Sequence, residues 1–140
     1  MSSIIQISVF MDNKHGRLST ITGALAQANI NIFGFCVVDS EDFGIIRLVV
    51  DDTKKAVDAL HKAQLAVSST PVLLVEVKDM PGGAKDVFDI FAKREICIDY
   101  SYGVRSAVIA FGIEDVDTAA KILMEEDIKL LSLDDLKKIQ

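Results

Sequence analysis

The first candidate binding element is residues 12–18, where basic side chains gather in an otherwise acidic protein. Lys14, His15 and Arg17 lie within four residues of one another, just before a run with helical spacing. The free N–H groups and the dipole of a helix N-terminus attract anions, whereas a cation in the first turn opposes that dipole. An anionic ligand group such as a carboxylate would account for Arg17 there. A solvated turn with incidental charges is the alternative, and Asn13 could equally form an Asx turn with its own backbone.

A second candidate loop, residues 79–84, carries no basic side chain. Its Asp79 would repel a carboxylate, although the same side chain could bind an ammonium group. We take Met80, Pro81 and Gly82 as its candidate binding residues. The difference in charge predicts two sites of unequal quality, of which the first loop is the better site for a carboxylate.

Both loops occupy the same position in an internal repeat that organises the chain. Residues 7–32 align without a gap on residues 73–98, an offset of 66, and after a hairpin three residues shorter in the second half the offset becomes 63. Gly16 and Gly82 coincide in this alignment. A glycine at both places indicates a backbone that turns sharply or approaches a ligand closely, and a purely structural turn explains the pair equally well.

Within each half the hydrophobic period changes in the same order. Apolar and polar residues first alternate, as in a half-buried strand; they then recur at helical spacing, and two β-branched and aromatic runs form a hairpin. A second helix and a short strand complete the half. The elements expected are strand 5–9, helix 18–28, strands 30–38 and 44–50, a helix from residue 51 and strand 65–69. Their counterparts are strand 72–78, helix 83–93, strands 96–102 and 107–113, helix 115–125 and strand 127–131.

The order βαββαβ predicts an α+β fold of two tandem ferredoxin-like units, each an antiparallel sheet with two helices on one face. We place the first domain at residues 1–70 and the second at residues 71–140. They are joined only by Thr70-Pro71, so the halves should touch. Ser132 predicts the N-cap of a short C-terminal helix with acidic residues in its first turn and lysines in its last.

The small size of each half predicts association. A lone core of about 65 residues is marginal, and a sheet with helices on one face leaves its other face open. Five apolar strand residues are expected on that open face: Phe33, Phe35, Val37, Ile45 and Val49. The other repeat or another chain should cover them, and we expect a homodimer in which four units pair.

Charge and composition exclude several other classes of protein. The net charge of −6 argues against a surface that neutralises nucleic-acid phosphates. The sequence has neither an apolar run long enough for a membrane span nor a signal-peptide pattern at its start. We therefore expect a cytoplasmic protein that binds neither nucleic acid nor membrane.

Metal binding and catalysis are not expected either. Cys36 and Cys97 fall in apolar runs that predict buried thiols, and His15 and His61 are too few for a convincing metal site. The sequence contains no nucleophile-elbow, phosphate-loop or dinucleotide-binding glycine motif. The acidic clusters belong to an expected hairpin tip and to helix ends, and they should be solvated.

The two loops resemble a known family motif. Residues 13–18 read Asn-Lys-His-Gly-Arg-Leu and residues 79–84 read Asp-Met-Pro-Gly-Gly-Ala, similar to the N/D-x-P-G-x-L loop of the ACT domain family. Both loops follow the first strand of a βαββαβ unit. The resemblance covers nearly the whole chain, which is similar to the stand-alone tandem ACT proteins of bacteria and archaea. The sequence departs from the motif at His15, where the family usually has proline. It also has Gly83 and Ala84 where the first loop has arginine and leucine.

The resemblance implies a regulatory protein that binds a free amino acid at the seam between two ACT units, without catalysis and without a cofactor. The second strand of the neighbouring unit, residues 98–102, would contribute Tyr100 and Ser101. Tyr100 and Tyr102 share one strand parity, so one ring could pack over a ligand side chain, although ordinary strand aromatics explain them as well. The loop would contribute Asn13, Lys14, His15, Gly16, Arg17 and Leu18. The alternative is a non-catalytic regulatory or structural subunit that docks on an enzyme of amino-acid metabolism.

Overall fold

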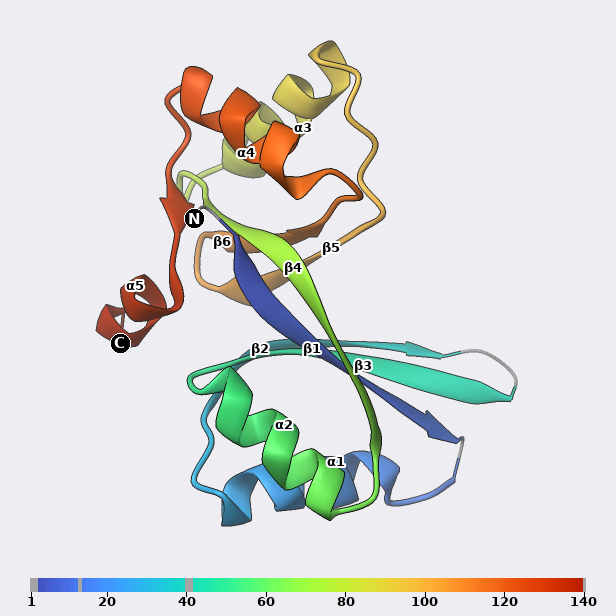
Figure 1. Cartoon of the computed structure of the whole chain (residues 1–140). Helices are drawn as coiled ribbons and strands as arrows, with labels where there is room; N and C mark the ends of the chain where they lie inside the picture. Colours follow the sequence, from blue (N-terminus) through green and yellow to red (C-terminus); the bar gives the residue numbers. More distant parts are fainter. Residues whose placement is uncertain (1–2, 13, 40–41, 140) are drawn as a thin grey trace. The chain divides into compact units, whose positions relative to one another are not determined.

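The computed structural model describes residues 3–12, 14–39 and 42–139 (Figure 1). The chain divides into two compact units, Ile5–Thr70 and Pro71–Gln140, the latter together with the first residues of the chain. In chain order the elements are β1 (Ile4–Asp12), α1 (Arg17–Gln27), β2 (Ile32–Asp39), β3 (Phe43–Val50), α2 (Thr53–Lys62), β4 (Ala66–Glu76), α3 (Gly83–Lys93), β5 (Tyr100–Arg105), β6 (Val108–Gly112), α4 (Val116–Glu125), β7 (Leu130–Leu131) and α5 (Leu133–Lys138). Within the described ranges, no helix is both long and apolar enough to cross a membrane.

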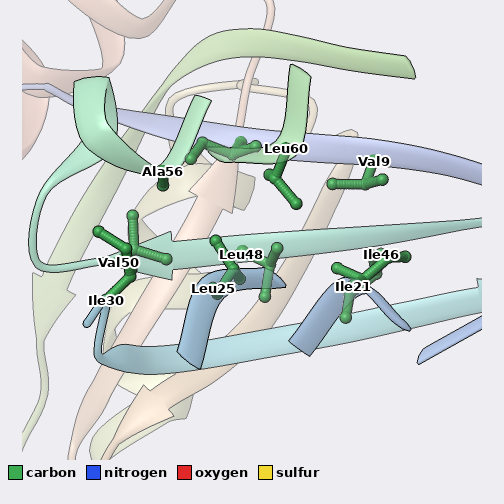
Figure 2. Packing of buried hydrophobic residues seen from close by; sticks show 10 residues of the cluster. Val9, Ile21, Leu25, Ile30, Ile46, Leu48, Val50, Ala56 and Leu60 are labelled. Atoms are coloured by element: carbon green, nitrogen blue, oxygen red, sulfur yellow. The ribbon is translucent and has the colours of Figure 1, made fainter. Parts of the chain in front are cut away.

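The first unit is an antiparallel sheet with α1 and α2 on one face (Figure 1). Its strands run in the order β2-β3-β1, and β4 lies next to β1. The register pairs Ile7 with Leu48 and Val9 with Ile46, so these four apolar side chains share the face that the helices cover. The buried side chains that the helices pack onto them are Ile21, Leu25, Ala56 and Leu60 (Figure 2).

The second unit repeats this arrangement in the order β5-β6-β4, with the short β7 beside β4. Leu73 pairs with Phe111 on the face that α3 and α4 cover. Phe91 of α3 meets Phe111 edge to face, with ring centroids 5.1 Å apart and an interplanar angle of 69°, as aromatic quadrupoles favour. The predicted fold class is therefore confirmed, because both units are ferredoxin-like and a short helix ends the chain.

The repeat extends to the backbone conformation. Gly16 and Gly82 both lie in the left-handed region, with φ of 83° and 88°, which glycine adopts at little cost. The residues one past each helix cap form two more left-handed pairs: Asn29 and Glu95, with φ of 59° and 57°, and Gln64 and Asp127, with φ of 62° and 59°. Each of these residues ends a helix by the same type of turn.

Helix starts repeat as well. The carboxylates of Asp52 and Asp115 each accept a backbone N–H bond of 3.1 Å, from Lys55 and Thr118 respectively. These bonds satisfy amides that have no partner inside the helix. The predicted cap of the last helix is confirmed, since Ser132 forms a reciprocal capping box at the start of α5.

One predicted strand boundary is wrong. β4 runs without interruption from Ala66 to Glu76, whereas the sequence predicted two strands separated by Thr70-Pro71. Proline fixes φ near about −65° and pushes the residue before it toward extended conformations, and a strand tolerates both. The proline therefore did not end the strand.

A second boundary is also displaced. β5 begins at Tyr100 and not at residue 96, because its partner β6 ends at Gly112, directly opposite Tyr100. Beyond that point the ladder has no strand to extend along. Ile96 and Ile98 instead pack against the core on the helix side of the sheet.

The residues expected on the open face of the first sheet divide between its two faces. The register opposes Phe35 to Leu48 and Val37 to Ile46, which places both on the helix-covered face. A register shift between residues 32 and 34 inserts one residue into β2, and a one-residue slip moves every later side chain to the opposite face. Ile45 and Val49 of β3 keep the predicted orientation.

Candidate functional site

The loop between β1 and α1 and the end of β2 line a cleft of about 500 Å³ within the first unit. We call it the first cleft. It brings together five of the candidate loop residues with residues of β1, α1 and β2, and its lining comprises Met11, Asp12, Lys14, His15, Gly16, Arg17, Leu18, Ser19, Val37 and Asp39. The sixth candidate of this loop, Asn13, lies outside the described residues.

Arg17 has a partner within the chain. Its guanidinium Nε donates to Oδ1 of Asp12 and its Nη2 donates to Oδ2 at 3.0 Å. The Nζ atom of Lys14 lies 3.7 Å from the same Oδ2. The hydrogen bond from Arg17, together with the charges of Arg17 and Lys14, holds the pKa of the Asp12 carboxyl below its usual value. Asp12 therefore supplies the anion that the sequence argument had assigned to a ligand.

Gly16 forms the N-cap of α1. Its φ is 83°, a conformation that strains any residue with a side chain. The shape of the turn is therefore enough to explain a glycine at this position. A Cβ added there would meet no atom within 4 Å, so the space above the cap is open. The amide groups of the first helical turn have no partner inside the helix, and a ligand anion approaching over Gly16 could bind them.

The charges around the first cleft are of both signs. Lys14 and Arg17 come from the loop, and Asp12 and Asp39 come from the ends of β1 and β2. This arrangement suits a small zwitterion better than a simple anion, because each ligand charge finds an opposite charge. Among all the residues that the structure describes, no group of three or more His, Cys, Asp or Glu side chains is placed to hold a metal ion.

The matching loop of the second unit lines a second cleft of about 580 Å³. The loop itself carries no cation, but Lys78 before it and Arg105 of β5 both line the cleft. Arg105 lies at the end of β5, 26 residues after Asp79, and only the fold brings it to the loop. The lining residues of this second cleft are Val77, Lys78, Asp79, Met80, Pro81, Ala84, Gly103, Arg105, Ala107, Val108 and Ile109.

The departure of this loop from the family motif at Gly83 has a steric cause. A Cβ at Gly83 would lie 1.9 Å from the carbonyl oxygen of Lys78. No residue with a side chain fits at position 83 unless the backbone shifts. Gly82 remains the N-cap of α3, as predicted from the repeat. The loop geometry thus excludes any side chain at the position that Arg17 holds in the first unit.

Tyr100 and Ser101 lie on β5, and neither is among the residues that line the two clefts. The ring of Tyr100 covers Gly112 of the adjacent strand, where a Cβ would lie 2.1 Å from its Cζ atom. Tyr100 and Tyr102 stack with centroids 6.5 Å apart and an interplanar angle of 14°. The stack of the two rings along β5 and the packing of Tyr100 on Gly112 therefore explain their shared parity without a ligand.

The two cysteines differ from the prediction. Cys36 is partly buried and Cys97 is exposed, so the expectation of two buried thiols is wrong. Cys97 lies in the segment before β5, where its neighbours Ile96 and Ile98 take the positions that face the core. The intervening side chain is left pointing outward.

These features define the class of protein. It consists of two tandem ferredoxin-like units, and each unit has a glycine N-cap on its first helix and a charged cleft beside that cap. A family model described as an ACT domain pair matches residues 2–140, and the chain belongs to this family. The predicted resemblance is thereby confirmed. Among curated proteins, no sequence matched the chain.

Solved structures are similar to the chain over nearly its full length. Protein BT0572 from Bacteroides thetaiotaomicron is 32% identical, with 99% of this chain and 98% of that chain covered and a TM-score of 0.90. The ligand-free regulatory subunit of aspartate kinase from Thermus thermophilus is 16% identical, with coverage of 89% and 93% and a TM-score of 0.61. E. coli aspartokinase III in complex with lysine and aspartate is 18% identical, with 88% of this chain but 31% of that chain covered and a TM-score of 0.53. The last two share the fold.

Proposed function

We propose that the chain is a regulatory protein that binds a free amino acid at the first cleft and catalyses no reaction itself. The observation that carries the proposal is that one cleft is lined both by cations of the loop, Lys14 and Arg17, and by the carboxylate of Asp39 at the end of β2. A free amino acid carries one carboxylate and one ammonium group. Gly16 leaves open the approach of a carboxylate to the N-terminus of α1.

The relatives in fold support this ligand class. One is a regulatory subunit of aspartate kinase, and another is an aspartokinase in complex with lysine and aspartate. Both are similar in fold to most of this chain. We therefore propose an amino acid as the ligand of the first cleft.

We further propose a homodimer in which the second copy completes the open side of this cleft. β2 forms one wall of the cleft and is the edge strand of its sheet. Phe35, Val38 and Phe43 on this hairpin are 58%, 46% and 53% exposed. An apolar edge strand favours pairing with another chain.

A thermal-shift screen tests the proposed ligand class. The melting temperature would be measured with each of the twenty amino acids at millimolar concentration, and with nucleotides and oligonucleotides as controls. At least one amino acid should raise it by mass action, and the controls should not. No shift with any amino acid would contradict the proposal. That result would favour the alternative, a non-catalytic subunit docking on an enzyme of amino-acid metabolism, for which two relatives in fold are described as aspartokinase subunits.

A further inference from the structure

Another cleft of the first unit, of about 540 Å³, lies where β1 ends beside the start of β4. Phe10 of β1 and Phe43 of β3 both line it, and we call it the aromatic cleft. Gln64 and Leu65, in the turn between α2 and β4, also belong to its lining, whereas residues 14–16 of the first loop do not. The aromatic cleft is therefore a different place from the first cleft.

The two aromatic residues lie on the same face of the sheet. Phe10 pairs with Ile45, and Phe43 pairs with Asp12, so Phe10 and Phe43 are diagonal neighbours on adjacent antiparallel strands. Such neighbours lie about 7–8 Å apart, within reach of each other's aromatic side chains. Phe10 is 44% exposed and Phe43 is 53% exposed. Two solvent-accessible rings are thus close enough together to contact one small group.

The repeat shows that the fold does not require an aromatic residue at either position. At the repeat offsets of 66 and 63, the counterparts of Phe10 and Phe43 are Glu76 and Ser106. Both counterparts are exposed polar residues in the second unit. Adjacent exposed aromatic side chains, at positions where the same fold accepts polar ones, indicate a binding surface.

The charge of the aromatic cleft favours a cation. The guanidinium of Arg17 and the carboxylate of Asp12 line the cleft but are bound to each other by two hydrogen bonds, so this pair is neutral. Asp42, directly before Phe43, takes part in none of the ion pairs between the residues that the structure describes. A carboxylate without a counter-ion beside exposed rings attracts a cation and repels an anion.

We propose that the aromatic cleft binds a quaternary or methylated ammonium ion. The methyl groups of the ion pack on the rings of Phe10 and Phe43, and Asp42 balances its charge. The ring quadrupole places negative charge on each aromatic face, and an ammonium bearing methyl groups in place of N–H bonds needs no hydrogen-bond acceptors there. This inference goes beyond the proposed function, because the ligand and the aromatic residues that bind it are different from those of the first cleft.

Four small probes separate cation binding from simple apolar binding. Choline and tetramethylammonium carry a quaternary ammonium, 3,3-dimethylbutan-1-ol is the neutral isostere of choline, and ethanolamine carries a primary ammonium. Amide chemical shifts of the full-length ¹⁵N-labelled protein report the site, with Gln64 and Ala66 for the aromatic cleft and Gly16 and Val37 for the first cleft. Both quaternary ions should give saturable shifts at Gln64 and Ala66 only, and they should bind at least about 3-fold more tightly than the other two probes.

Substitutions of the rings test the contact with the aromatic faces. Phe10→Leu and Phe43→Leu keep an apolar side chain but remove the aromatic face, so each should weaken choline binding by about 2- to 30-fold. Phe43→Tyr keeps the face and should bind choline as the wild type does. Phe35→Leu is the matched control, since it replaces a ring of β2 that is 58% exposed and lies outside this cleft, and it should change nothing.

A substitution of the carboxylate tests the contribution of its charge. Asp42→Asn should weaken choline binding by about 2- to 5-fold and should leave binding of the neutral isostere unchanged. Asp58→Asn makes the same change of charge on the exposed surface of α2, outside the cleft, and should have no effect. Should Phe10→Leu fold poorly, Phe43→Leu and Asp42→Asn decide the question.

Three results would overturn this inference. They are equal binding of choline and its neutral isostere, choline binding that survives both ring substitutions, and an absence of saturable shifts at Gln64 and Ala66 with either quaternary ion at millimolar concentration. In the third case, light scattering that shows a lower mass for Phe43→Lys than for the wild type would assign the rings to an interface between copies of the chain. None of these results concerns amino-acid binding at the first cleft, so the proposed function is tested independently.

Discussion

Arg17 and Asp12 form a bidentate ion pair across the turn between β1 and α1. Asp12 is the last residue of β1 and Arg17 is the first of α1. The pair therefore joins the two elements that position the first cleft. The pair also creates competition for the Arg17 guanidinium, because a ligand carboxylate must share it with the Asp12 carboxylate that is already bound.

This competition predicts opposite effects for substitution of the two partners. Arg17→Ala should weaken amino-acid binding at the first cleft by about 2- to 30-fold, since a charge-assisted hydrogen bond is lost. Asp12→Asn should strengthen binding, because the guanidinium becomes available to the ligand. Calorimetry on both variants checks the prediction. Weaker binding in both would mean that Asp12 serves to orient Arg17 for the ligand.

The same pair predicts a pH dependence of stability. The pKa of Asp12 is lowered in the folded protein, chiefly by the hydrogen bond from Arg17. A group with a depressed pKa stabilises the fold above its unfolded pKa, and that contribution is lost as the pH falls through the folded pKa. Wild type should melt above Asp12→Asn at pH 7, and the gap should close below about pH 3. The exposed Asp58→Asn serves as control, and a gap that persisted in acid would contradict the assignment.

Gly16→Ala and Gly82→Ala should differ in binding but not in stability. Both glycines have φ near 85°, at 83° and 88°, so each alanine should destabilise the fold by a similar amount, about 1 to 2 kcal/mol. Amino-acid binding at the first cleft should fall sharply in Gly16→Ala, because the Cβ obstructs the amides that open α1. Gly82→Ala should affect binding less, since Asp79 in that loop repels a ligand carboxylate. Equal losses in calorimetry would show that both helix N-termini bind the ligand.

Gly83→Ala should destabilise the second unit by about 1 to 3 kcal/mol through overpacking. The added Cβ would lie 1.9 Å from the backbone oxygen of Lys78, so α3 or the loop must move. Gly103→Ala is the matched control, because its Cβ would meet no atom within 4 Å. Denaturant midpoints of the two variants measure the difference, and similar midpoints would show that the loop adjusts easily.

The homodimer proposal predicts a specific sensitivity at β2. Light scattering of the wild type at micromolar concentration should give the mass of two chains, and Phe35→Lys should shift the population toward one. A lysine on an edge strand opposes pairing with another chain. Met124→Lys, at a similarly exposed position on α4, should leave the mass unchanged. A monomeric wild type would contradict the proposal.

The parts of the fold that local sequence determines were predicted well. The cap at Ser132 and the turns at Gly16 and Gly82 depend on residues within a few positions of one another. Hydrophobic period and repeat offset then gave the order of elements, because one face of each element must be apolar wherever the chain is folded. These features belong to the amino-acid sequence by itself.

What only the tertiary structure decided involves residues far apart or a change of register. The bulge after Ile32 moved Phe35 and Val37 to the other face of the sheet, and no period in the sequence reports an inserted residue. Arg105 reaches the loop of Asp79 because β5 ends beside the start of α3. Residues from every wall of a cleft contribute to its charge, and a loop identified in the sequence forms only one of these walls.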